Sequence, residues 1–163
     1  MASTFEPLAT TTLGSAASSI TFSSIPSTYT DLRLVLTCTA SNGMSYILFN
    51  SSTSGYSWNL IYGNGTSADV DLYTSYSYLG LNSRDANNSN IAFYTVDIFS
   101  YAGSTYKTSL ITSSHDQNGS GQVCAEVGLW QNTSAINQID IKLQSTYTYS
   151  AGTTATLYGI KAA

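Results

Sequence analysis

DLRLVLTCT, residues 31–39, decides the fold because its side chains alternate with a period of two. One side of the stretch is apolar and consists of Leu32, Leu34, Leu36 and Cys38. The opposite side carries the charged residues Asp31 and Arg33. This alternation is what a half-buried antiparallel strand requires, with one face on the core and one toward water.

The stretch just before it, IPSTYTDL, contains Pro26, one of only two prolines in the chain. Proline fixes its own backbone angle and has no N–H to give to a sheet. We therefore expect a turn between a first strand that ends near Ile25 and the long strand that begins at Asp31. Tyr29 is expected to pack its ring beneath that turn.

The same alternation recurs along the rest of the chain. NIAFYTVDIF, residues 90–99, and QVCAEVGLW, residues 122–130, are the two other clear examples. Weaker strand candidates are residues 18–22, 45–50, 56–63, 106–113, 136–144 and 154–161. These make about nine short strands separated by Gly/Asn/Ser turns, and no stretch shows the apolar spacing of a helix.

Many short strands without βαβ spacing predict an all-β antiparallel β-sandwich in a single domain, residues 19–163. The predicted core includes the apolar members of the clearest runs: Leu34, Leu36, Val96, Ile98, Val127, Ile141 and Leu157. In QVCAEVGLW the side with Val123 and Val127 is taken as apolar, and Glu126 and Trp130 fall on the other side.

Residues 1–18 differ from the body because they are rich in Ser, Thr and Ala. They are predicted to form an extended N-terminal arm, since they hold too few apolar groups to make a core of their own. Phe5, Glu6, Pro7 and Leu8 are the predicted partner contacts, because the three apolar residues are unusual for a tail that only meets water. A loose chain end is the alternative.

The chain is poor in charge. Only 9% of its 163 residues are charged and the net charge is −4, so Ser, Thr and Asn must provide solubility. The five basic residues are scattered, which argues against direct nucleic-acid binding. No apolar run is long enough to span a membrane, and the N-terminal residues lack the basic and apolar segments of a secretory signal. Cys38 and Cys124 are expected to be free buried thiols, with one disulfide as the alternative.

No chemical cluster stands out. His115 is the only histidine, and in a Gly/Asn-rich loop it is expected to face solvent. Acidic and amide residues near Asp69, Asp71, Asp85 and Asp116 do not follow the spacing of a calcium loop. Paired carboxylates for glycoside cleavage are also missing. We therefore expect no enzyme activity, no catalytic residue, no metal and no cofactor.

Aromatic residues are the remaining signal. The chain has thirteen tyrosines, of which Tyr73, Tyr76 and Tyr78 lie close together, and two tryptophans, Trp58 and Trp130. Exposed aromatic rings bind sugars or anchor protein interfaces, whereas buried rings fill the core. With so few charges, some tyrosines are expected at the surface, which favours an interface.

Two phrases give the chain a family resemblance. TFSSIPSTYTDLRL at residues 21–34 and TLYGI at residues 156–160 resemble phrases that bracket small virion structural proteins of tailed bacteriophages. The resemblance spans most of the chain and implies a phage particle component. It does not specify the place in the particle, because similar chains are assigned to capsids and to tails.

The resemblance implies a jelly-roll-like sandwich that acts as a capsid cement or decoration protein. Such a protein would be localised in the virion, assembled in the cytoplasm of the bacterial host, and would form a homo-oligomer, expected to be a trimer. Its partner would be the major capsid protein or another virion protein, met by the N-terminal arm. The alternative is a receptor-binding or tail-fibre tip module that binds a host surface glycan, and a cell-wall enzyme is a third, weaker alternative.

Overall fold

The structure is a computed structural model that describes residues 4–81, 90–116 and 121–161. This part of the chain contains strands and no helix. The strands are β1 Phe5–Thr12, β2 Ser19–Phe22, β3 Asp31–Cys38, β4 Ser45–Phe49, β5 Tyr56–Gly63, β6 Ala68–Tyr76, β7 Leu79–Leu81, β8 Ala92–Phe99, β9 Lys107–Asp116, β10 Gly121–Trp130, β11 Ile139–Leu143 and β12 Thr154–Ile160.

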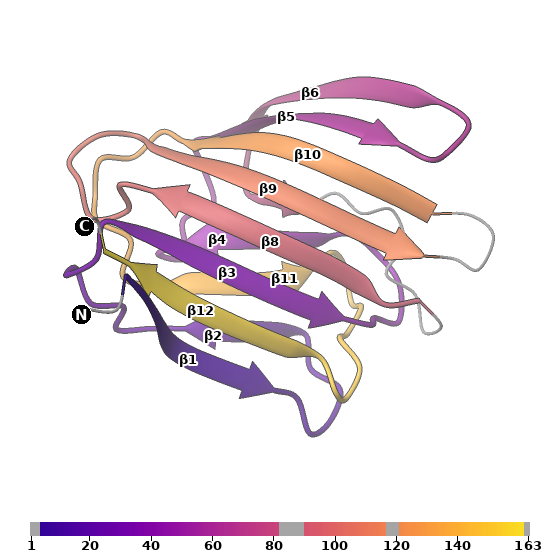
Figure 1. Cartoon of the computed structure of the whole chain (residues 1–163), viewed down its shortest axis with the longest axis horizontal. Helices are drawn as coiled ribbons and strands as arrows, with labels where there is room; N and C mark the ends of the chain where they lie inside the picture. Colours follow the sequence, from indigo (N-terminus) through magenta and orange to yellow (C-terminus); the bar gives the residue numbers. More distant parts are fainter. Residues whose placement is uncertain (1–3, 82–89, 117–120, 162–163) are drawn as a thin grey trace.

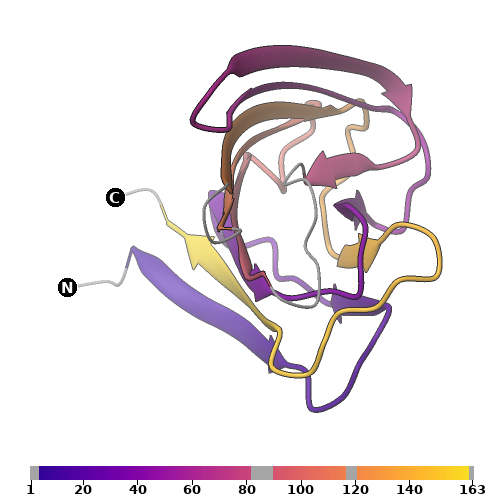
Figure 2. The ribbon, with the colours of Figure 1, turned by 90° about the vertical axis from the view of Figure 1, so that its right-hand side faces the viewer.

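The strands form two antiparallel sheets of unequal size. The large sheet has eight strands in the order β1-β12-β3-β8-β9-β10-β5-β6, and the small sheet has four in the order β2-β11-β4-β7. The large sheet lies in front of the small sheet in Figure 1, and it curls around the small sheet in Figure 2. The prediction of an all-β fold with antiparallel strands is confirmed.

The stretch that decided the fold, β3, lies between β12 and β8 in the large sheet. Leu34 is opposite Leu157 on β12 and Val96 on β8, so one inward row crosses three strands. The nine predicted segments are all strands, and the turn around Pro26 joins β2 to β3. Strands β1, β6 and β7 were not predicted.

The core lies between the two sheets. Most of the predicted core residues are buried, with an exposed fraction of at most 1%: Leu34, Leu36, Val96, Ile98, Ile141 and Leu157. The small sheet contributes Ile47 and Phe49 from β4 and Ile139 from β11. At about 25 cal/mol per Å² of buried apolar surface, these side chains are the main stabilising contribution to folding.

The prediction for Val127 is wrong, because this residue lies on the outer face with 59% of its surface exposed. The inward side of β10 is the one with Glu126 and Trp130. Trp130 packs against Phe49, with ring centroids 5.6 Å apart. Gly128, on the same side, faces β7 so closely that a Cβ atom there would lie 2.6 Å from the Leu79 side chain. Burial of the Trp130 ring therefore determines which side of β10 faces the core.

Two matched valine substitutions test this orientation. Val96→Thr places a hydroxyl in the core at a residue with no exposed surface, and it should lower the free energy of unfolding by about 1–3 kcal/mol. Val127→Thr should change it by less than about 0.5 kcal/mol, because the hydroxyl meets water. Urea unfolding followed by tryptophan fluorescence measures both, and equal losses would contradict the assigned face.

Candidate functional site

The N-terminal segment forms the edge of the large sheet. β1 pairs with β12 from Phe5 opposite Ile160 to Thr12 opposite Thr154, and the register shifts between Pro7 and Ala9. β1 lies along its own sheet, so the arm that was predicted for residues 1–18 stays a prediction. Its predicted contact with a partner stays a prediction.

The four predicted contact residues point in different directions. Phe5 is 41% exposed, and its ring centroid lies 4.7 Å from that of Tyr158. Pro7 is exposed, whereas Leu8 is half-buried and packs against the core. Glu6 makes contacts within the chain. The outward groups that a partner would meet are therefore Phe5 and Pro7.

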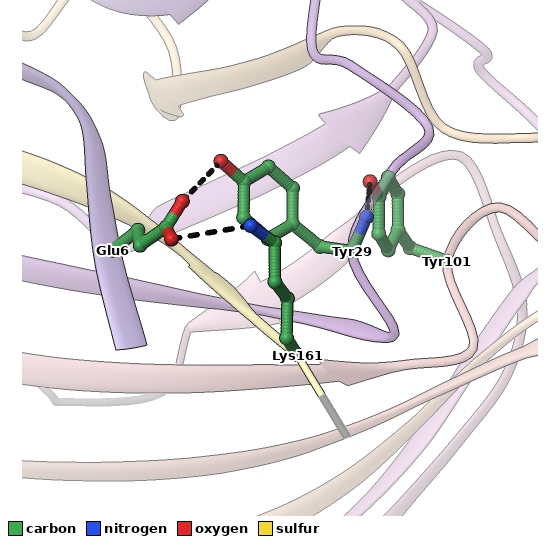
Figure 3. Close-up of polar contacts among 4 residues, drawn as sticks. All are labelled: Glu6, Tyr29, Tyr101 and Lys161. Atoms are coloured by element: carbon green, nitrogen blue, oxygen red, sulfur yellow. Dashed lines mark hydrogen bonds and ion pairs between the residues drawn. The ribbon is translucent and has the colours of Figure 1, made fainter. Parts of the chain in front are cut away.

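Glu6 joins the two ends of the described chain. Its Oε2 accepts a hydrogen bond of 2.8 Å from the Tyr29 hydroxyl, and its Oε1 lies 3.1 Å from Nζ of Lys161. The Lys161 ammonium also lies 5.1 Å from the centroid of the Tyr29 ring. These three residues, drawn in Figure 3, are called the terminal clasp below.

The clasp depends on Gly159, which is opposite Glu6 in the β1–β12 register. The Tyr29 ring lies directly against Gly159, and a Cβ atom there would overlap it. The backbone N–H of Thr30 donates to Ile160 O at 2.8 Å. A glycine inside a strand often marks a close approach of this kind. The turn before β3 and the end of β12 therefore form one unit.

Tyr101 fixes the other side of the same turn. Its hydroxyl donates to Pro26 O and accepts a hydrogen bond from the Tyr29 N–H at 3.4 Å. The Tyr101 ring is buried, so the turn is anchored to the core rather than lying free on the surface. Tyr29 lies at this turn and packs against the core, as the sequence predicted.

A groove with a volume of about 240 Å³ lies beside β1. It lies between the edge strands of the two sheets, β1 and β2. Its apolar lining consists of Leu8, Phe22, Ile25, Pro26 and Leu157. An apolar groove next to an exposed strand edge can accept an extended segment of another chain. The edge strand and the groove together are therefore suited to binding such a segment.

The clasp changes the acidity of its members. Hydrogen bonds from Tyr29 and Lys161 hold the pKa of Glu6 below its ordinary value of 4.5, and the Glu6 carboxylate raises the pKa of Tyr29. A carboxyl group with a lowered pKa stabilises the fold above its ordinary pKa. That contribution disappears as the pH falls through the lowered value.

Glu6→Gln tests the clasp without changing its shape. Wild type should melt at a higher temperature than the variant at neutral pH. The difference should shrink as the pH falls below the ordinary carboxyl pKa and vanish once Glu6 is protonated in the folded protein, because protonated Glu and Gln are both neutral. The pKa of Asp140 is also lowered, but Asp140 is present in both proteins, so its effect cancels. A melting difference that is constant across the pH range would contradict the clasp.

His115 is not where the sequence placed it. It lies in β9 and is buried, opposite Ala92 on β8 and Gln122 on β10. The expectation that it faces solvent is wrong, because the strand extends to Asp116 and turns the ring inward. Glu126 is also buried, opposite Ile111 on β9. Polar side chains therefore line the inward side of the β9–β10 hairpin.

Among the residues that the structure describes, the candidate calcium ligands are not gathered. Asp69 and Asp71 lie in β6, whereas Asp85 falls outside the described residues. Within the described ranges, no group of three or more His, Cys, Asp or Glu side chains is placed to hold a metal ion. No helix long and apolar enough to cross a membrane occurs in that same part of the chain.

Two buried ionisable groups serve the structure. Nζ of Lys107 donates to the backbone oxygens of Gly103 at 2.6 Å, of Thr105 and of Thr133 at 3.4 Å, so its N–H groups hold two loops together. Burial lowers the pKa of Lys107. Burial acts to raise the pKa of Asp140, but hydrogen bonds from Thr21, Ser51 and Gln138 outweigh it, and the pKa lies below the ordinary value.

Cys38 and Cys124 are free and buried, which confirms the preferred interpretation. Burial raises the pKa of Cys38 to about 12 and that of Cys124 to about 11. The thiolate is the reactive form, so both groups are protected at neutral pH by burial and by protonation.

Thiol labelling checks this state. In the native protein, both cysteines should react with a maleimide far more slowly than in urea, at a rate set by unfolding. Mass spectrometry counts the added groups, and the urea-treated chain is the control. Rapid native labelling of either cysteine would show that it is not buried.

The tryptophans lie inside the molecule. Trp58 stacks on Tyr73, with ring centroids 4.7 Å apart, and Tyr76 meets its edge at the same distance. Trp130 is also buried. Tyr73, Tyr76 and Tyr78, for which the sequence left both a surface and a core position open, are half-buried around Trp58.

Sequence reasoning missed both the terminal clasp and the exposed apolar side of β10. The glycine in LYGIK was the available signal for the clasp, because a strand glycine needs a packing reason.

No family model, no curated protein and no solved structure matches this chain.

Proposed function

We propose that this chain is a structural protein of a bacteriophage virion, a capsid cement or decoration protein that stabilises the head shell. The two phrases that carry the resemblance to virion proteins contact each other, and this observation carries the proposal. Tyr29, from the first phrase, packs on Gly159 of the second. A jelly-roll-like sandwich and a homotrimer are parts of the same proposal.

The edge at β1 is the proposed contact with the shell. An edge strand leaves backbone N–H and C=O groups on its outer side, and an extended segment of a capsid subunit can pair with them. Phe5 and Pro7 would meet that partner, and the groove beside Leu8 would take an apolar side chain. The clasp supports this contact because it holds β1 in place before binding.

The low charge of the chain supports the proposal that it stays permanently bound in a particle. On the outer face near β1, the Thr10 and Thr156 hydroxyls are 3.1 Å apart, and so are those of Thr12 and Thr154. Such a surface hydrates through hydroxyl groups, and its contacts depend little on ionic strength. That property is useful for a protein that must stay bound as salt conditions change.

The alternative, a receptor-binding or fibre-tip module for a host glycan, needs exposed aromatic platforms. Both tryptophans are buried, and Tyr73 and Tyr76 pack on one of them. The tryptophans therefore provide no such platform, which favours the cement protein. The exposed aromatic rings lie elsewhere, at Phe5, Phe93, Phe99 and Tyr106.

The proposal is tested first by copy number. In particles of the phage that encodes the chain, quantitative mass spectrometry should find it in amounts comparable to the major capsid protein. An amount comparable to tail-fibre subunits would favour the alternative, and complete absence from particles would overturn the virion assignment.

Variants of β1 test the contact. Phe5→Ala combined with Pro7→Ala should weaken binding to shells that lack the protein by about tenfold or more. Thr10→Ala combined with Thr12→Ala, on the same strand, is the control and should bind as wild type does. Point variants are preferable to deletion of residues 2–12, because that deletion removes the whole of β1. Equal binding by both double variants would contradict the proposed contact.

A further inference from the structure

Half of the outer face of the large sheet is apolar. Six residues on four adjacent strands form this surface, called the apolar face below: Ile61, Val70, Leu72, Leu110, Val123 and Val127. Each has between 40% and 69% of its surface exposed. In Figure 1 the large sheet lies in front of the small one, so β9 and β10 turn this face toward the viewer, and Figure 2 shows that the sheet curls over at β5 and β6.

The six side chains are contiguous across the strands. Val70 on β6 is opposite Ile61 on β5, which is opposite Ala125 on β10. In the next row Val127 on β10 is opposite Leu110 on β9. Apolar groups that adjoin in this way make one patch rather than scattered surface residues, and such patches mark interaction sites.

The central part of the apolar face carries no charge. Its outward positions are Ala68, Val70 and Leu72 on β6, Ser57, Asn59 and Ile61 on β5, Val123, Ala125, Val127 and Leu129 on β10, and Thr108, Leu110, Thr112 and Ser114 on β9. The register places Asp116, the last residue of β9, at the end of the same outward row. The other half of the same sheet face differs. It holds the Arg33–Asp97 ion pair, with Nη2 and Oδ2 2.8 Å apart, and the threonine pairs near β1.

We propose that a second copy of this chain packs on the apolar face. Each copy has a net charge of −4, so the repulsion between two copies is smallest where they meet through a surface that holds few charges. A charged partner would find no opposite charge there. Two like faces in contact make a twofold dimer, so this inference is separate from the homotrimer of the proposed function, and it does not depend on a place in a virion.

The size of the face fits this occupant. With strands about 4.8 Å apart and about 3.4 Å per residue, four strands of seven or eight residues cover about 500 Å². Two copies would thus bury about 1,000 Å² in total, which is near the lower limit for a specific interface.

Pairing through the neighbouring strand edge is disfavoured. β6 is the edge strand, and its pairing with β5 has a register shift near Trp58. Ser75 has a φ of 62°, which bends the strand. Asp69 and Asp71 on β6 add charge beside that edge. Bulges and charged residues are the usual protections of an edge, so the face is the better surface for self-association.

The test compares matched charge insertions in the full chain. Wild type should sediment as an oligomer at micromolar concentration, and Ile61→Lys combined with Val127→Lys should sediment as a monomer. Thr10→Lys combined with Thr156→Lys adds the same charge to the other half of the sheet face and should leave the oligomer intact. Circular dichroism checks that each variant is folded.

Two measurements on wild type keep the test valid if the first variant does not fold. Oxidative footprinting of Leu72 and Leu110 should decrease as the protein concentration rises through the association range. Added salt should strengthen association or leave it unchanged, because it screens repulsion between like charges.

A monomeric wild type, an oligomer that survives the Ile61/Val127 change in a folded variant, or footprinting that does not change with concentration would overturn the inference. Loss of shell binding by an intact oligomer would count only against the cement proposal.

Discussion

The Tyr29 ring lies against Gly159, where any side chain would overlap it, and much of the large sheet depends on this contact. The contact sets the turn before β3 against the end of β12, and it places the Tyr29 hydroxyl within 2.8 Å of Glu6 on β1. Three neighbouring strands are thus joined at one end by a single aromatic side chain. Tyr101 ties the same turn to the core, so the edge of the sheet is linked to its centre.

The sequence predicts much of this fold because β3 and β8 have one apolar side each, and those sides are buried. It fails for β10 because both sides of that strand contain apolar residues. Alternation alone favoured Val127, but the Trp130 ring and the space needed beside Gly128 decide the orientation. β1 and β6 were missed because Thr, Ser, Asp and Pro interrupt their patterns. The clasp joins residues 155 positions apart, and no local pattern contains such a contact.

The unequal sheets explain why aromatic and polar residues occupy the interior beneath β5, β9 and β10. Four strands cannot cover eight, so the large sheet curls, and Trp58 with its tyrosines fills the space beneath β5 and β6. Further along the same concave side lie His115 and Glu126. The outer side has the opposite composition, with a hydroxyl-rich part near β1 and valine, leucine and isoleucine near β6. The two proposed contact regions, the β1 edge and the apolar face, therefore lie in parts of the outer side that differ in composition.

The strand order has a consequence for how the chain reaches its fold. β12 lies between β1 and β3, although residues 154–160 are made long after both of them. During synthesis β1 therefore has no neighbour to pair with, and one edge of β3 stays unpaired until β12 arrives. Pairing between such distant segments is slow because a long loop must close first. Unpaired edges of this kind are sites where nascent chains associate wrongly. Rapid expression should consequently favour aggregation over folding, and slower synthesis at low temperature should raise the soluble yield.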